Sequence, residues 1–192
     1  MKLTALSLLA VIAFPVCALC QPEPRIKVLS TPEDPTKKTI LVGRTEAAGM
    51  IIQFELEPAK PMVMMMGSPP KPIEHAPAEG EIYHVEVKPI DPGSKTRIPY
   101  AHIIFEAVNR DNGKSLKGEL HSMWGSSGLH YSMNSALLGD GAYTATITVH
   151  SPTFSRSLKD RNLFMTPAIT KFHFKLRDRV LTEVSEPAPA VN

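Results

Sequence analysis

The sequence predicts an all-β protein, an immunoglobulin-like antiparallel β-sandwich of about seven or more strands. Three observations lead to this fold class. Apolar and polar residues alternate with a period of two in several short segments, which is typical of half-buried strands. Turn residues separate these segments at short, even intervals. No long stretch has the helical period of 3.6, so the strands are expected to pack sheet on sheet.

The first twenty residues have the composition of a cleavable export signal. Lys2 supplies a positive start, an apolar run follows, and residues 16–20 contain small residues suited to cleavage. Cleavage after Ala18 and cleavage after Cys20 fit equally well. Both cysteines of the chain lie at this boundary, so the mature protein is expected to fold without a disulfide. We therefore expect a signal peptide at 1–20 and export to the periplasm without a lipid anchor.

About 170 residues remain, enough for one domain with a sizeable core. We predict a loose, proline-rich leader at 21–35, a β-sandwich domain at 36–182 and a disordered tail at 183–192. The formal charge of +2 argues against nucleic acid or an anionic membrane as partner. No later stretch approaches the roughly twenty apolar residues of a membrane span, so the protein is not expected to be membrane-embedded.

Alternation and turn residues place the individual strands. The first is a short β-branched run, and in each of the others apolar side chains recur at every second position. Six prolines between residues 58 and 77 predict a long irregular loop, which carries the methionine cluster Met62–Met66. The predicted strands are 39–42, 50–56, 82–88, 101–107, 116–123, 143–149 and 172–176.

One hairpin carries the residues with the clearest chemistry. His121 and Met123 lie on one face of a strand, Gly125–Gly128 forms a turn, and His130 follows directly. An imidazole and a thioether on the two arms of one bend suit copper better than calcium or magnesium. The alternative is that Met123 packs in a core and His130 makes ordinary hydrogen bonds.

A second strand adds two candidate ligands. His84 and Glu86 lie on the face opposite Val85 and Val87, where packing of the core explains them least. His84, Met123 and His130 would give two nitrogen donors and one sulfur donor, and either Glu86 or His121 would complete the set.

The other histidines and the methionine cluster are open to simpler explanations. His102 and His173 are expected to be solvated, whereas His75 and His150 fit either role. Met62–Met66 either binds Cu(I) or fills gaps beneath a loop.

Motifs of catalysis are absent from the sequence. It contains no Gly-x-Ser-x-Gly elbow, no glycine-rich phosphate loop after a strand, and no His-Glu-x-x-His helix. We therefore do not expect an enzyme.

Several of these segments resemble the periplasmic iron-transport protein family. The resemblance extends from about Gly49 to Leu176. Its most specific part is Met123 followed seven residues later by His130-Tyr131, together with the upstream strand that contains His84 and Glu86. The other matching segments are Gly49-Met50 leading into Leu56-Glu-Pro58, Ile98-Pro-Tyr100, Asp111-Asn-Gly-Lys114 and Lys117-Gly118.

The resemblance implies an exported β-sandwich homodimer that binds copper and a second metal, iron, and serves an inner-membrane iron permease. It places His84, Met123 and His130 on the family's copper ligands and Glu86 on a carboxylate of a second or shared site. This chain departs from the family's pattern at two places that bear on the fourth copper ligand. The loop 152–163 lacks the family's further histidine, and position 121 carries His121 where the family tends towards methionine. The alternatives are a periplasmic copper chaperone or copper-resistance protein and, third, a scaffold module without metal.

Overall fold

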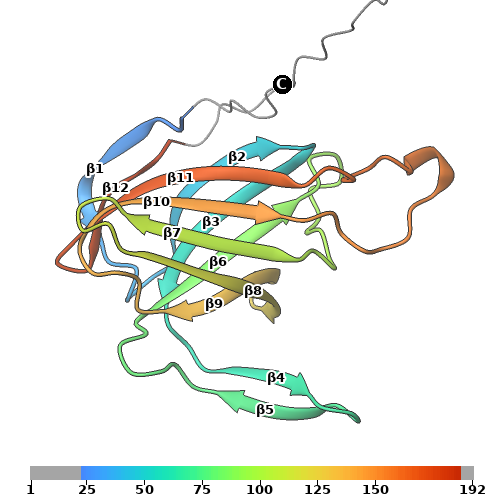
Figure 1. The fold of residues 1–192 in the computed structure, drawn as a ribbon, viewed down its shortest axis with the longest axis horizontal. Coiled ribbons are helices and arrows are strands. Elements are labelled where there is room, and N and C mark those ends of the chain that lie inside the picture. Colours follow the sequence, from blue (N-terminus) through green and yellow to red (C-terminus); the bar gives the residue numbers. More distant parts are fainter. Residues whose placement is uncertain (1–22, 187–192) are drawn as a thin grey trace, which may run out of the picture.

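The computed structural model describes residues 23–186, which form two layers of antiparallel strands (Figure 1). Ten strands follow one another in the order β1-β12-β11-β10-β7-β8-β9-β6-β3-β2, and β4 and β5 form a separate hairpin. The predicted all-β sandwich is confirmed. The strands are β1 (Ile26–Glu33), β2 (Ile40–Ala47), β3 (Met50–Pro58), β4 (Met62–Met66), β5 (Lys71–His75), β6 (Tyr83–Ile90), β7 (Ile103–Asn109), β8 (Ser115–Gly125), β9 (Gly128–Ser135), β10 (Gly141–Val149), β11 (Ala168–Arg177) and β12 (Val180–Ser185).

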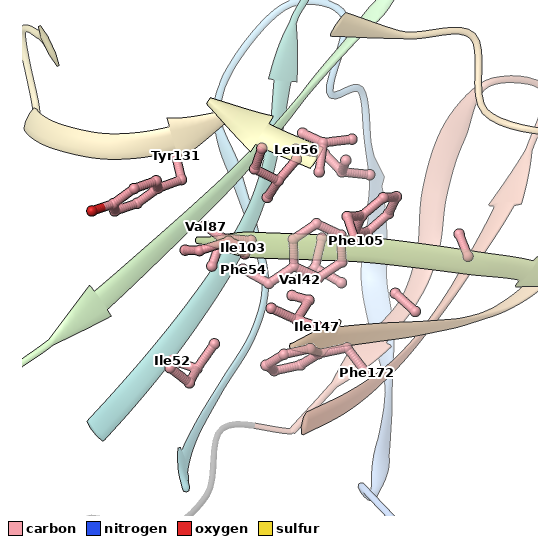
Figure 2. Close-up of a cluster of buried hydrophobic side chains, with 14 of the residues drawn as sticks. Val42, Ile52, Phe54, Leu56, Val87, Ile103, Phe105, Tyr131, Ile147 and Phe172 are labelled. Atoms are coloured by element: carbon pink, nitrogen blue, oxygen red, sulfur yellow. The ribbon is translucent and has the colours of Figure 1, made fainter. Parts of the chain in front are cut away.

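The core forms where the apolar faces of the two layers meet. In β10 every second residue is buried, from Gly141 to Val149, because successive side chains of a strand point to opposite faces. Figure 2 shows Phe54 of β3 among Phe105 of β7 and Phe172 of β11; the ring centroids lie 5.7 and 5.6 Å apart. These tilted aromatic contacts join the layers and stabilise the sandwich.

Strand β8 connects the two layers and positions the predicted hairpin. Its first half pairs with β7, from Ser115 to Leu120, and its second half pairs with β9, from His121 to Gly125. Strand β9 in turn pairs with β6, and β6 pairs with β3. The outward faces of β3, β6, β9 and the second half of β8 therefore form one continuous surface.

The structure corrects three sequence predictions. Residues 26–33 of the predicted loose leader form β1, which pairs with β12, and the predicted tail begins inside β12, which ends at Ser185. The predicted irregular loop contains the hairpin β4–β5. These strands escaped prediction because β1 and β5 contain proline and β1 and β12 show no clear alternation. The predicted signal peptide and residues 187–192 lie outside the described residues.

Within residues 23–186 no helix has the length and apolar composition needed to cross a bilayer. The helical structure of this part of the chain is a single 3₁₀ turn at Leu158–Asp160.

Candidate metal centre

The hairpin β8–β9 brings the predicted sulfur and nitrogen donors face to face. Met123 pairs with His130 across the two strands, and His121 pairs with Ser132. The turn predicted at Gly125–Gly128 is confirmed, with φ of +83° at Gly128, a conformation that glycine adopts without strain. Because cross-strand partners share a face, all four side chains lie on the same face of the sheet, the one opposite the hydrophobic core.

His130 is held with one ring nitrogen free. Its Nδ1 lies 3.0 Å from the Gly128 carbonyl oxygen, so Nδ1 carries the proton and Nε2 keeps its lone pair. The residue is 1% exposed, and Nε2 has no hydrogen-bond partner among the described residues. Burial lowers the pKa of the imidazole. His130 is therefore neutral at pH 7 and suited to bind a cation.

His84 presents the same arrangement from strand β6. Its Nδ1 lies 2.8 Å from Oδ1 of Asn134, the side-chain amide of which donates to the Lys60 carbonyl oxygen at 2.9 Å. This orientation makes Nδ1 the protonated nitrogen. His84 is fully buried, its Nε2 lacks a hydrogen-bond partner in the described chain, and burial lowers its pKa. The rings of His84 and His130 lie 6.2 Å apart at 81°.

Glu86 clusters with the two imidazoles. Its Oε2 is 3.7 Å from Nε2 of His130, and one potential ligand atom from each of His84, Glu86 and His130 lies within 4.8 Å of the others. The Lys88 ammonium contacts a Glu86 oxygen at 2.5 Å, and the Ser127 hydroxyl donates to Glu86 at 3.4 Å. The carboxylate is thus fixed by side chains from β6 and from the β8–β9 turn.

Two neighbouring carboxyl groups of this centre have pKa values that move in opposite directions. Burial and a hydrogen bond with Glu57 raise the pKa of Glu86 to about 7. Burial alone would raise the pKa of Glu57, but the hydrogen bond from Glu86 and the Lys60 ammonium lower it to about 2. Glu57 is therefore ionised at pH 7, whereas Glu86 keeps its proton to a higher pH than an ordinary glutamic acid does.

Met123 faces His130 across the β8–β9 hairpin. It is half-buried, and its sulfur accepts a hydrogen bond from the Ser132 hydroxyl at 3.6 Å. Two unpartnered imidazole nitrogens, a carboxylate and a nearby thioether form a donor set that fits copper. Two orphaned nitrogens in a buried site are costly unless a ligand satisfies them.

His121 is not part of the buried cluster of His84, Glu86 and His130. His121 is exposed, although it shares the outward face with Met123 and His130.

The remaining histidines have other surroundings. His102 is exposed and stacks on His150 with ring centroids 4.9 Å apart. The prediction that His173 is merely solvated is wrong. It is 8% exposed, and its ring contacts Glu23 and Thr144.

Sequence reasoning missed the polar neighbours that organise the centre. Glu57, Lys60 and Asn134 bind one another or His84, but they come from segments about 75 residues apart. Glu57 could have been found from the sequence, because it continues the polar face of strand β3 after Gln53 and Glu55. Lys60 and Asn134 could not, since only the folded chain brings them together.

Comparison with solved structures supports the architecture. FetP from uropathogenic E. coli strain F11 matches with a TM-score of 0.61 at 22% identity, covering 72% of this chain and 96% of FetP. Copper-reconstituted P19 from Campylobacter jejuni matches with a TM-score of 0.59 at 23% identity, covering 72% of this chain and 96% of P19. At these identities the likeness establishes the fold. A comparison with curated proteins finds no match.

The fold and the buried His/Glu cluster define a β-sandwich protein with a candidate metal centre. The sequence model for the Fe²⁺ transport protein family matches residues 40–166, two thirds of the chain. The chain belongs to the Fe²⁺ transport protein family, which confirms the resemblance seen in the sequence.

Proposed function

We propose that this chain is an exported, periplasmic copper-binding protein that acts in iron uptake, as a homodimer, beside an inner-membrane iron permease. The observation that carries the proposal is the pair of buried, unpartnered Nε2 atoms of His84 and His130, which cluster with Glu86. Membership of the Fe²⁺ transport protein family supports the role in iron uptake. Of the two proteins with a similar fold, FetP and P19, the P19 structure was solved in a copper-reconstituted form.

Four side chains of this centre are assigned as copper ligands. His84 and His130 supply the two nitrogens, Met123 supplies sulfur, and Glu86 supplies oxygen after losing its proton. Imidazole serves both copper oxidation states, and the thioether favours Cu(I). Bound copper would supply a cation with two accessible oxidation states, and iron would be the cargo at a second or shared site. His121 would replace Glu86 as the fourth protein ligand only if its exposed side chain turns towards Met123.

A copper chaperone or copper-resistance protein is the second candidate. The absence of histidine from residues 152–163 and the methionines of β4 favour it. The burial of His84 and His130 favours a retained metal instead, because a chaperone must present its ion to a partner. A scaffold module without metal leaves the orphaned nitrogens unexplained.

A deletion strain separates these functions. Failure of growth under iron limitation supports iron uptake, whereas copper sensitivity with normal iron-limited growth supports the chaperone or resistance function. A strain with neither phenotype would support the scaffold. Light scattering that shows a monomer at micromolar concentration would contradict the dimer.

Copper titration by calorimetry tests the ligand assignment. His84→Ala and His130→Ala are each expected to weaken binding of both Cu(I) and Cu(II). His121→Ala is the informative comparison: a loss equal to that of His84→Ala would make His121 a ligand, and parental binding would exclude it. Parental binding in all the variants would refute the site.

A further inference from the structure

A lysine is buried on the same polar face as the metal centre. Lys88 of β6 is 5% exposed, although lysine is almost never fully buried in a protein unless its charge is paired. Glu86 on the same strand and Glu55 on the adjacent strand β3 are buried as well. Removing three charged groups from water costs free energy, so this cluster calls for a role that justifies it.

The register of β3 and β6 explains why a cation is needed here. Glu55 lies directly opposite Glu86, and Gln53 lies opposite Lys88. Like charges directly opposite one another on neighbouring strands destabilise a sheet. The Lys88 ammonium lies 2.5 Å from Oε2 of Glu55 and 2.5 Å from Oε1 of Glu86. It therefore joins two carboxylates that would otherwise repel each other.

The lysine is itself held in place from β3. Oε1 of Glu55 accepts a hydrogen bond from the side-chain amide of Gln53 at 2.5 Å, and Oε2 of Glu55 accepts one from Lys88. A continuous chain of contacts thus connects Gln53, Glu55, Lys88 and Glu86. Buried polar side chains that are satisfied in this way become rigid, so the position of Glu86 is fixed from outside the metal centre.

The two oxygens of Glu86 have different surroundings as a result. Oε1 contacts the Lys88 ammonium and lies 3.4 Å from the Ser127 hydroxyl. Oε2 lies 3.7 Å from Nε2 of His130, which has no hydrogen-bond partner within residues 23–186. Because Lys88 and Ser127 both engage Oε1, Oε2 is the oxygen that faces the unpartnered nitrogen.

We propose that Lys88 is a positioning residue of the metal centre: it holds Glu86 by one oxygen, aims the other at His130, and thereby favours Cu(II) over Cu(I). The inference rests on the copper site proposed above and assigns a role to a residue outside its ligand set. Partners of this kind orient the ligands of metal ions without touching the ion.

The preference for Cu(II) follows from the donor that Lys88 positions. A carboxylate oxygen is a harder donor than imidazole or thioether, so a fixed Glu86 stabilises Cu(II) more than Cu(I). The positive charge of Lys88 would act in the opposite direction, but Glu55 neutralises it at 2.5 Å. The orientation of Glu86 therefore decides the effect, and Lys88 and Met123 favour opposite oxidation states.

Competition titrations of Cu(II) and of Cu(I) into Lys88→Leu test this role. Cu(II) affinity should fall about 10–100-fold, and Cu(I) affinity should fall less. Lys175→Leu is the matched control, since it removes a lysine that pairs with Glu183 in the other layer of the sandwich, and it should bind copper as the parent does. Unchanged or tighter Cu(II) binding in Lys88→Leu, or equal losses for the two oxidation states, would overturn the inference.

A double-mutant cycle separates positioning from a general structural effect. In the Glu86→Gln background Lys88→Leu should cost no further Cu(II) affinity, because the lysine acts through Glu86. A further loss equal to that in the parent would show that Lys88 acts independently of Glu86, and would refute the proposal. If Lys88→Leu does not fold, Glu55→Gln/Lys88→Leu takes its place in both measurements, because it replaces the buried ion pair by neutral side chains.

A crystal structure of metal-free Lys88→Leu distinguishes this inference from the proposed function. Oε2 of Glu86 should turn away from Nε2 of His130, while the rings of His84 and His130 keep their places. That result would support the positioning role even if the parent bound no copper, a failure that would refute the proposed function alone. A Glu86 side chain that stays where it is in the parent would contradict the positioning role.

Discussion

Copper binding is expected to release a proton from Glu86 near neutral pH. The carboxyl must be ionised to coordinate copper, and burial with the Glu57 hydrogen bond raises its pKa to about 7. Copper should therefore displace a larger fraction of a proton at pH 7 than at pH 8. The two histidines add little in this range, because burial lowers their pKa values. Affinity should consequently fall as the pH drops through 7, the pKa of Glu86.

Calorimetric titration in two buffers of different ionisation enthalpy measures this proton count. Glu86→Gln is the matched control, because the amide keeps the size of the side chain and has no proton to release in this range. The parent should show the pH-dependent release and Glu86→Gln should show almost none. No release from the parent at pH 7, or equal release from both proteins, would refute the role assigned to Glu86.

Three further variants test the site and the fold around it. Met123→Leu keeps the volume and removes the sulfur, so Cu(I) affinity should fall more than Cu(II) affinity in competition titrations; equal losses would contradict the thioether as ligand. A Cβ at Gly125 would lie 3.0 Å from Cε1 of His130, so Gly125→Ala should displace this ring and weaken copper binding about tenfold with circular dichroism unchanged. A Cβ at Gly43 would lie 2.4 Å from Cδ1 of Phe172, so Gly43→Ala should lower the free energy of unfolding by about 1–3 kcal/mol in denaturant titrations; unchanged stability would show that the ring moves freely.

The sequence was sufficient to predict the sandwich because alternation reports directly which side of a strand is buried. Residues 141–149 and 103–107 follow the predicted period, and the turn at 125–128 has the glycine that its geometry requires. The strands that escaped prediction, β1 and β12, pair with each other across more than 140 residues. Local patterns carry no information on such a pairing, since neither strand has clear alternation.

The candidate site was predicted in its residues but not in its environment. Alternation placed His84 and Glu86 opposite the core, and the structure confirms that face. It also buries this face, with His84 0% and Glu86 2% exposed, and Glu57 of β3 and Asn134 of β9 lie against His84 there. The raised pKa of Glu86 results from that burial and from the nearby Glu57. Neither can be deduced from the order of residues along one strand.

The position of copper in the loaded protein tests the central claim most directly. Crystals of the copper-loaded protein, measured at the copper absorption edge, would give an anomalous difference map that locates the ion. We predict a peak bonded to Nε2 of both His84 and His130, with Met123 and Glu86 as the nearest further donors. A loaded protein with copper only at surface histidines such as His102 and His150, and none between His84 and His130, would contradict it.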